Sequence, residues 1–449
     1  MYQSIASKYA AKSVFITGGT GFLGKVLMEK LLYSCPDIDN IYVLLRPKKN
    51  LSPEQRFEKM LDVQIFNRLM NERPNDLNKI KPIAGDILRP RLGLSEKDEE
   101  LLIDSVSYVF HSAATVKFTE PLDVALKTNV KGSEKILNLC LRMKKIQALV
   151  HVSTAYSNTE IPIVNEVLYP PPVELEMIDQ LIVTAPDMDP QYITEKILAK
   201  KPNTYTFSKS LAENLVAKNH GNVPLVIVRP SVVCASKDEP VPGWVDSWQG
   251  ITGLSTFIMK GFNRSLYGSP TNLLDIIPAD YVCNLMIVAA KFSNYRSKEV
   301  TIYHACTSSE NPITLKEYCR LITTDSIKHN FNDMPMPTLM VSNSRVLIYL
   351  TYLILEMIPA ILGDLWLRIL GKEPRYLQAS DLRGATDFFS LHSWIFNTQR
   401  SSALSQSLSA ADKQEFPFNP SSINWTEYVP LFCGGIRKKF NKYTNNLKK

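Results

Sequence analysis

Tyr205 and Lys209 are the two residues whose types and spacing most clearly suggest chemistry. They lie four residues apart, so on a helix their side chains share a face. A tyrosine works as a general acid only when its pKa, about 10 in water, is drawn toward neutrality. A nearby ammonium group does this by favouring the phenolate. The pair therefore predicts proton transfer to a carbonyl oxygen.

A hydroxyl group is expected beside this tyrosine. The apolar run that starts at Ala148 ends in Ser153-Thr154, and a hydroxyl at a strand end can hydrogen-bond a substrate carbonyl. Thr154 is the first choice and Ser153 the second, and the sequence does not separate them.

A glycine turn near the N-terminus predicts a phosphate-binding site. Gly18, Gly21 and Gly24 follow the apolar run Val14–Thr17 and precede an apolar helical pattern that begins at Phe22. Gly18 permits a tight turn, Gly21 lets backbone approach a pyrophosphate, and Gly24 lets the helix pack closely on the strand. Free N–H groups and the helix dipole then hold phosphates.

The end of the second apolar run, Ile41–Leu45, indicates which dinucleotide binds. An acidic residue at this position selects NAD, whereas an arginine accommodates the 2′-phosphate of NADP. Here the run ends in Arg46-Pro47-Lys48-Lys49. Arg46 can bind a phosphate bidentately and Lys49 adds a point charge, so we expect NADP(H).

Further strand ends should face the same ligand, because ligands of parallel sheets bind outside the carboxyl ends. Asp86 could accept a hydrogen bond from the adenine amino group, with Ile87 beside it. The small residues Ala113, Ala114 and Thr115 would let the cofactor lie against the backbone. His111 is expected to be a packed strand-end histidine, and no metal site is predicted.

The elements that must position these residues alternate between strand and helix. Expected strands are 14–17, 41–45, 81–83, 107–111, 148–153 and 225–229, and expected helices are 22–33 and 121–143. Such alternation implies right-handed crossovers. The sequence therefore predicts an α/β fold, a Rossmann-type doubly wound parallel sheet, with a helical C-terminal domain.

Two stretches interrupt this pattern, and the character of the chain changes after them. Residues 156–203 are predicted to be an insertion, and residues 231–275, which lack clear periodicity, the start of a substrate-side subdomain. We expect a Rossmann domain at 1–310 that includes both. Residues 311–345 are expected to be a linker region, and 346–449 a helical C-terminal domain.

Residues 346–370 form the most apolar segment of the chain. A membrane span needs about 20 apolar residues, and this segment is marginal because Glu356 and Pro359 interrupt it. A membrane-surface helix or re-entrant hairpin is preferred over a true span, and a buried helix is the remaining alternative. The basic tail, including Arg437 and Lys439, is expected either to meet anionic lipid or to be solvated.

Composition limits the class of protein. The chain has 449 residues, 45% of them hydrophobic and 21% charged, so a globular body is expected. A net charge of +7 is too mild for a dedicated nucleic-acid binder but suits phosphate-rich ligands or membrane surfaces. Seven scattered cysteines indicate reduced thiols in a cytosol-facing protein. No signal peptide is expected.

In this order, the motifs resemble those of extended short-chain dehydrogenase/reductases. The strings TGGTGFLGKVLMEKLLYSCPDI, IYVLLRPKK, VFHSAATVKF, HVSTAYSN, NTYTFSKSLAEN and PGWVDSWQGITG are similar to fatty acyl-CoA reductases, and to insect members above all. The C-terminal SLHSWIFNTQRSSALSQSLSAADKQEFPFNPSSINWTEY resembles that family's male-sterility-type domain.

The resemblance implies reduction of a long-chain acyl-CoA to a primary fatty alcohol, with two NADPH and a bound aldehyde. It places Tyr205, Lys209 and Thr154 in the catalytic set, with Ser153 the alternative to Thr154. It also places Asn129 at the cofactor, and Pro230 and Ser231 near the nicotinamide. The full set expected to bind cofactor is Thr17, Gly18, Gly21, Phe22, Leu23, Gly24, Arg46, Lys49, Asp86, Ile87, Ala113, Ala114, Thr115, Asn129, Tyr205, Lys209, Pro230 and Ser231.

Three rival functions are compatible with the same motifs. One is an acyl-CoA reductase that releases the aldehyde, another is an extended reductase acting on hydroxysteroids or nucleotide sugars, and the third is an NADPH-binding sensor without turnover. The resemblance also implies a membrane-associated location facing the cytosol. The endoplasmic reticulum is expected, with the peroxisome or the lipid-droplet surface as alternatives.

Overall fold

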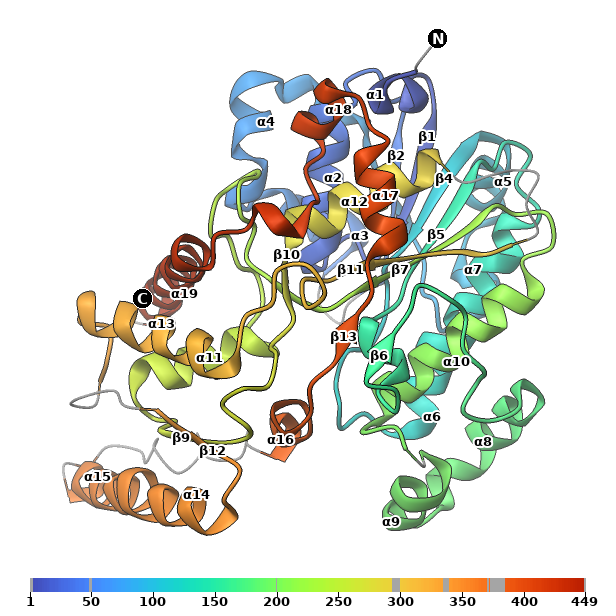
Figure 1. Cartoon of the computed structure of the whole chain (residues 1–449). Helices are drawn as coiled ribbons and strands as arrows, with labels where there is room; N and C mark the ends of the chain where they lie inside the picture. The colour runs from blue at the N-terminus through green and yellow to red at the C-terminus, as the bar shows by residue number, and fades with distance from the viewer. Residues whose placement is uncertain are drawn as a thin grey trace.

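The computed structural model is built on a seven-stranded, wholly parallel sheet, with strand order β11-β7-β5-β4-β1-β2-β3 (Figure 1). The strands are β1 (Ser13–Thr17), β2 (Ile41–Leu45), β3 (Ile80–Ala84), β4 (Val106–His111), β5 (Ala148–Val152), β7 (Leu225–Pro230) and β11 (Thr301–Ala305). This confirms the predicted Rossmann-type α/β fold. The structure describes residues 3–47, 51–198, 200–292, 299–333, 339–369, 371 and 384–447.

Helices cover both faces of the sheet, as the unbroken burial along β1, β2, β4, β5 and β7 requires. Val14 and Ile16 of β1 pack in one core cluster with α2 (Phe22–Ser34) and α12 (Ala279–Lys291). Phe15 packs in a second cluster with α7 (Gly132–Cys140) and α10 (Thr204–Asn219). Each core therefore takes every second side chain of the same strand.

The strand order reverses at β1, which has β2 on one side and β4 on the other. Both pairings are parallel, so the chain leaves β1 and β4 in opposite directions at the same carboxyl edge. A crevice is expected at that point of a doubly wound sheet, and the site described below lies there.

Shorter helices complete the sheet domain, and the helix expected over 121–143 is interrupted. It runs as α6 (Leu122–Ala125), a π-helical stretch (Leu126–Lys131) and α7. The others are α1 (Ile5–Tyr9), α3 (Pro53–Leu61), α4 (Asn67–Glu72), α5 (Glu96–Ser105), α8 (Ile178–Thr184) and α9 (Pro190–Tyr192).

Residues 231–275 are more ordered than their irregular sequence indicates. They contain β8 (Val232–Cys234), α11 (Ile251–Lys260) and β9 (Ser265–Tyr267), and β8 pairs with β10 (Ile276–Pro278). Helix α11 was not predicted, because Gly253 interrupts the apolar pattern of its first turn. A Cβ at Gly253 would lie 2.4 Å from the Trp248 carbonyl oxygen, so close packing excludes a larger residue.

The prediction that residues 311–345 form a linker is wrong for much of this segment. Helix α13 (Leu315–Lys328) occupies it, with Tyr318, Cys319 and Ile322 buried, because apolar residues recur at helical spacing along one side. Strand β12 (Met340–Ser342) then pairs with β9.

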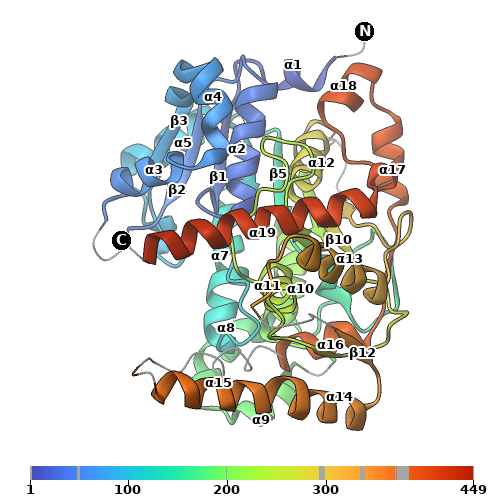
Figure 2. The same cartoon turned by 90° about the vertical axis from the view of Figure 1, so that its left-hand side faces the viewer.

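The C-terminal residues fold back onto the sheet domain. They form α14 (Arg345–Tyr352), α15 (Ile358–Ile369), α16 (Gly384–Leu391), β13 (Ile395–Phe396), α17 (Gln399–Gln406), α18 (Ala410–Glu415) and α19 (Trp425–Leu447). Figure 2 shows α19 crossing the molecule, and it packs against α13 and α11. Val429, Phe432 and Ile436 of α19 share the core cluster of Val14 and Ile16. The boundary expected near residue 345 therefore does not separate two cores.

The basic tail is part of α19, and its described cations divide into two groups: Lys438 and Lys442 are exposed, whereas Arg437 and Lys439 turn inward. Arg437 forms an ion pair with the buried Asp325, and Lys439 donates a hydrogen bond to the Asp246 carbonyl. Packing of α19 on α13 and on the loop at Asp246 directs these cations inward. Lys448 and Lys449 lie outside the described residues.

Candidate active site

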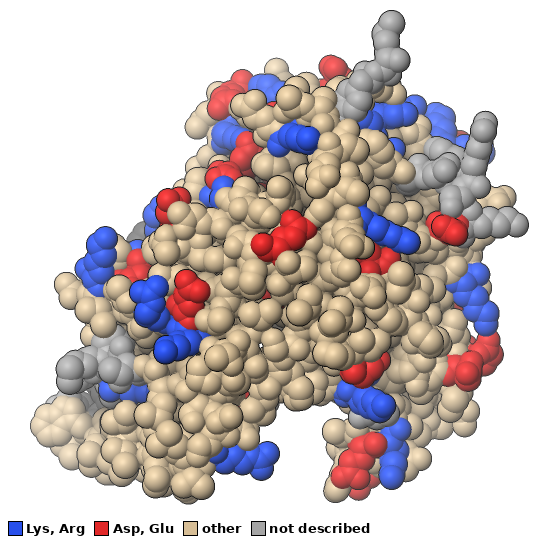
Figure 3. All heavy atoms as spheres, in the orientation of Figure 1, with Lys and Arg blue, Asp and Glu red and all other residues tan. Residues whose placement is uncertain are grey.

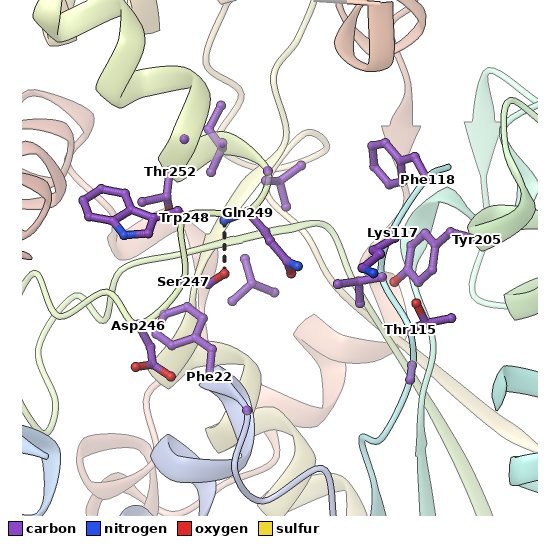
Figure 4. Close-up of a pocket in the computed structure, with 18 of the residues that line it drawn as sticks. Phe22, Thr115, Lys117, Phe118, Tyr205, Asp246, Ser247, Trp248, Gln249 and Thr252 are labelled. Atoms are coloured by element: carbon purple, nitrogen blue, oxygen red, sulfur yellow. Dashed lines mark hydrogen bonds between the residues drawn. The ribbon is translucent and has the colours of Figure 1, made fainter. Parts of the chain in front are cut away.

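A cavity of about 1400 Å³ opens at the carboxyl edge of the sheet, at the reversal of strand order. The ends of β1, β2, β3, β4, β5 and β7 contribute to one wall. The opposite wall comes from residues 245–263 and from the apolar segment at 352–360. In Figure 4, Tyr205 and Thr115 lie on one side of this space, and Trp248 and Gln249 on the other.

The glycine turn has the geometry of a dinucleotide cradle. Gly18 has φ +76°, and a Cβ there would lie 2.8 Å from the Ala113 nitrogen. A Cβ at Gly24 would lie 2.4 Å from the Gly18 carbonyl oxygen. Gly21 is the N-cap of α2, so the first turn of that helix, with Phe22 and Leu23, faces the cavity. Free N–H groups at such a helix start attract phosphate.

Two arginines meet at the end of β2. Arg46 lines the cavity as predicted, and Arg56, from the first turn of α3, lies beside it. Arg56 donates from Nη1 to the Arg46 carbonyl. Burial and the charge of Arg46 lower the pKa of Arg56. Neither arginine forms an ion pair with any described residue, so the two cations are available to an anion. Lys49 lies outside the described residues.

Sequence reasoning missed Arg56, although one signal pointed to it. Ser52 and Gln55 form a capping box that starts α3 shortly after β2 ends. A helix that starts so soon after a strand returns its first turn to the strand's tip. A cation in that turn was therefore a candidate.

The turn after β3 contributes Asp86 and Ile87, which both line the cavity. The Asp86 carboxylate accepts a hydrogen bond from the Leu88 N–H at 3.0 Å. The orientation of the Asp86 carboxylate is therefore set by the turn that follows β3.

After β4, the predicted residues divide into two groups. Ala113, Ala114 and Thr115 line the cavity, whereas Thr17 and Asn129 are buried behind it. The Asn129 side chain accepts from the Thr115 N–H at 2.9 Å and donates to the Thr115 carbonyl at 3.1 Å. Thr17 Oγ1 accepts from the Ala113 N–H at 3.3 Å. The expectation that Thr17 and Asn129 touch the ligand is therefore corrected: both hold the backbone that does.

Tyr205 and Lys209 lie on α10 and both line the cavity. Lys209 Nζ donates to the Val152 carbonyl at 2.7 Å, and burial lowers the pKa of Lys209 to about 8. Burial raises the pKa of Tyr205 to about 12, and a hydrogen bond with Thr154 acts in the opposite direction. The expected lowering of the Tyr205 pKa by Lys209 is thus not found here, because the ammonium is directed at the Val152 carbonyl.

Ser153 and Thr154 both line the cavity, and their environments separate them. The Thr154 hydroxyl interacts with Tyr205 and caps the turn at Ala155–Asn158. The Ser153 hydroxyl is buried without a hydrogen-bond partner among the described residues. Thr154 is therefore the better candidate to act with Tyr205. Pro230 and Ser231 line the cavity at the end of β7.

Several residues that line the cavity, on both of its walls, were not predicted individually. Lys117 and Phe118 lie close to Tyr205 in Figure 4, and the Phe118 and Tyr205 ring centroids are 6.0 Å apart. Asp246 Oδ2 lies 2.5 Å from Lys25 Nζ of α2. These residues come from the strings that carry the family resemblance, but their position across the cavity depends on the tertiary fold.

None of the six histidines or seven cysteines, all within the described residues, lines the cavity. His111 is buried, with the pKa of its imidazole lowered to about 3 by burial, and it bonds to Thr17 and Ser133. This agrees with the packed histidine expected there. All seven cysteines are buried. No cluster of potential metal ligands occurs among the described residues.

Comparison with known proteins assigns the chain to a family. It matches the male sterility protein family over residues 16–286 and again over 355–442. It is 36% identical over 441 residues to fatty acyl-CoA reductase 1 of Xenopus laevis and to that of Homo sapiens, covering 97% of this chain and 86% of each relative. The chain belongs to the fatty acyl-CoA reductase family. The family relationship supports a nicotinamide cofactor, for which this cavity is the candidate site, and the insect origin stays a prediction.

Solved structures share the fold of this reductase. The terminal R domain of the myxalamid biosynthetic pathway aligns with a TM-score of 0.62 at 20% identity, covering 96% of this chain and 91% of that one. The reductase domain of a nonribosomal peptide synthetase from Mycobacterium tuberculosis aligns with a TM-score of 0.65 at 18% identity, covering 95% and 91%. At such identities the likeness concerns the fold alone.

Proposed function

We propose that this protein reduces long-chain fatty acyl-CoA to a primary fatty alcohol and free CoA, with NADPH as the reductant. The observation that carries the proposal is the union, in one cavity, of Tyr205, Lys209 and Thr154 with a largely apolar facing wall. The family relationship supports the acyl-CoA substrate.

The residues present fit a dinucleotide phosphate. The tight turn at Gly18–Gly24 leaves no room for a side chain at Gly18 or Gly24 and turns the start of α2 toward the cavity. Arg46 and Arg56 are two cations without a carboxylate partner among the described residues, which supports NADPH over NADH, since the 2′-phosphate would neutralise them. Ser153 and the backbone at 113–115 would face the rest of the cofactor. When bound, the nicotinamide supplies hydride.

Tyr205 is proposed to hold the proton that each reduction needs. Its raised pKa keeps the phenol protonated at neutral pH, so Oη can donate to the substrate oxygen. Thr154, bonded to Tyr205, would orient the same oxygen. Lys209, charged below pH about 8, would favour the phenolate that forms when the proton leaves.

Two successive reductions balance the reaction. The thioester carbonyl gains a hydride and a proton to form a thiohemiacetal, which expels CoA as the thiol and leaves an aldehyde. A second hydride and proton give the alcohol. Altogether one acyl-CoA and two NADPH with two protons give alcohol, CoA and two NADP⁺. An aldehyde-releasing reductase would stop after CoA leaves.

The facing wall argues against a nucleotide-sugar substrate, and the catalytic residues argue against a sensor. A nucleotide sugar needs polar partners, but this wall includes Val245, Trp248, Leu254, Phe257 and Phe262. A sensor without turnover has no need for the Tyr205, Lys209 and Thr154 set.

A membrane-associated, cytosol-facing location, at the endoplasmic reticulum first, is part of the proposal. The exposed apolar helix at 345–366 supports it, because such a surface is better accommodated by lipid than by water.

Tyr205→Phe tests the proposed proton donor. Turnover of acyl-CoA should fall by about 10²-fold or more, because no other described hydroxyl takes its place. NADPH binding, followed by cofactor fluorescence, should stay within about twofold, since the phenol proton is not needed for binding. Gas chromatography of the wild-type products from a panel of acyl-CoAs separates alcohol from aldehyde.

Tyr33→Phe is the matched control, because Tyr33 is a surface residue that bonds to Glu72 and lies outside the cavity. It should retain wild-type turnover. Full activity of Tyr205→Phe would contradict the assignment, and aldehyde as the sole product would replace the alcohol-forming proposal by the aldehyde-releasing one.

A further inference from the structure

The apolar segment after residue 344 forms one continuous helix with two different faces. It runs through α14, a π-helical turn at Leu353–Met357, and α15. Its inner face reaches the active-site cavity, where Tyr352, Leu355, Met357 and Ala360 form part of the wall. The helix is therefore a structural part of the site.

The outer face of this helix is exposed and apolar. Almost none of the 22-residue stretch Arg345–Trp366 is buried, although it is long and apolar enough to cross a membrane. Trp366 is 62% exposed and Ile369 75% exposed. Figure 3 shows the surface over α14 and α15, at the lower left, as almost entirely uncharged. The exposed large side chains of the outer face are Val346, Leu347, Tyr349, Leu350, Ile354, Ile358, Ile361, Leu362, Leu365, Trp366 and Ile369.

Polar contacts fasten the helix to the body of the protein. The Glu356 carboxylate accepts hydrogen bonds from the Arg264 N–H at 3.0 Å and the Ser265 hydroxyl at 2.7 Å. Immediately before the helix, β12 pairs with β9, and Arg345 donates to the Tyr267 hydroxyl at 3.0 Å. Arg264, Ser265 and Tyr267 all belong to the segment that follows the cavity wall.

These contacts decide between a helix that spans a bilayer and one that lies along it. In a span, Glu356 would lose its donors and enter hydrocarbon, which is costly, and the cavity would lose part of its wall. A helix in the plane of the interface keeps every inner contact and buries only the outer face. A soluble location would instead leave a large apolar surface in water.

We propose that the helix at 345–369 lies flat in one leaflet of a phospholipid membrane and forms the wall along which the acyl chain enters the cavity. The outer face occupies the interface, and the inner face continues the apolar surface as far as the catalytic cavity. The second half of this inference rests on the proposed acyl-CoA substrate, whereas the membrane-bound geometry does not.

Cysteine labelling tests the geometry without any turnover. Asn343→Cys and Arg368→Cys place single exposed thiols near the two ends of the helix, and the seven native cysteines are buried and give a low background. On intact microsomes, a membrane-impermeant maleimide should label both variants. If one variant reacts only after the membrane is permeabilised, the helix spans the bilayer and the proposal fails.

Vesicle flotation tests the outer face. Leu362→Glu combined with Trp366→Glu should weaken binding to phosphatidylcholine–phosphatidylserine vesicles by about tenfold or more, because two anchoring side chains are lost. Val183→Glu on α8 is the matched control, since Val183 is 73% exposed but lies away from the helix. Equal binding by the wild type and both variants would overturn the proposal.

The inner face has its own test. Ala360→Trp adds bulk to the cavity wall, and we expect the preferred acyl chain to become shorter, measured as kcat/KM over a chain-length series. Unchanged chain-length preference would contradict the entry route while leaving the labelling result intact. A wild-type enzyme that reduces no acyl-CoA would instead defeat the proposed function and leave the membrane geometry standing.

Discussion

At the scale of single residues, the active site depends on charges held close together by backbone contacts. Lys209 is fixed by the Val152 carbonyl, and Arg56 by the Arg46 carbonyl. Neither contact joins two side chains, so each cation keeps its charge available to a ligand. The preference for NADPH over NADH and the pH dependence of kcat/KM should therefore depend on these cations.

Arg46→Ala and Arg56→Ala should each raise the KM for NADPH by roughly 10- to 100-fold, the value of one or more hydrogen bonds to a charged group. The KM for NADH should change little, because NADH has no 2′-phosphate. Steady-state kinetics with both cofactors measures this. Lys97→Ala, which removes an exposed cation of α5 outside the cavity, is the control. Equal changes for both cofactors would show that the phosphate is held elsewhere.

The pH dependence of kcat/KM for the cofactor should follow the protonation state of Lys209. Because its pKa is lowered to about 8, the ammonium is present below that pH and is lost above it. If this charge assists Tyr205, kcat/KM for the cofactor, which reflects the enzyme before cofactor binds, falls as pH rises through about 8. A profile that is flat from one unit below to one unit above this value would remove Lys209 from the mechanism.

At the scale of elements, the last helix holds the loop that faces Tyr205 and Lys209 across the cavity. Gly435 of α19 packs directly on Gly243, and Lys439 bonds to the Asp246 carbonyl and lies over the Trp248 ring. Asp246 in turn pairs with Lys25 at the start of α2. The facing wall is therefore fixed between the C-terminal helix and the helix that starts at the glycine turn.

Two adjacent glycines of α19 make this arrangement testable. A Cβ at Gly435 would lie 1.7 Å from the Gly243 carbonyl oxygen, whereas a Cβ at Gly434 would come no closer than 3.7 Å to Arg437. Gly435→Ala should lower the free energy of unfolding by about 1–3 kcal/mol and raise the KM for acyl-CoA, because the loop must move. Gly434→Ala should stabilise the helix by up to about 1 kcal/mol with an unchanged KM. Denaturant unfolding and kinetics measure both, and identical behaviour would refute the bracing role.

At the scale of the whole molecule, the cavity joins segments from almost the full length of the chain. Its wall includes Gly18 near the N-terminus and Ala360 toward the C-terminus, and the core cluster of β1 also contains α19. Sheet domain and C-terminal helices should therefore unfold together.

NADPH should raise the temperature of this single unfolding transition. At 100 times its Kd, a ligand of the folded state adds about 2.7 kcal/mol, which for a chain of this size corresponds to a shift of roughly 3 °C. Calorimetry with and without NADPH measures the shift. Two separate transitions, only one of them moved by NADPH, would show that the C-terminal helices are an independent unit.

The sequence by itself predicted six of the seven strands, the glycine turn, Arg46, and the pair Tyr205 and Lys209 with a hydroxyl at Ser153 or Thr154. Each of these is a local pattern: a strand end, a turn or one helix face is defined by residues within a few positions of one another. The parallel fold then follows, because strands and helices alternate.

Only the tertiary structure decided which residues reach the ligand and which hold the backbone behind it. It moved Thr17 and Asn129 behind the wall, turned Arg437 and Lys439 inward, and made the apolar helix part of the cavity. These outcomes depend on contacts between segments tens to hundreds of residues apart. Such contacts are set by how the packed layers meet, and no local pattern in the chain encodes them.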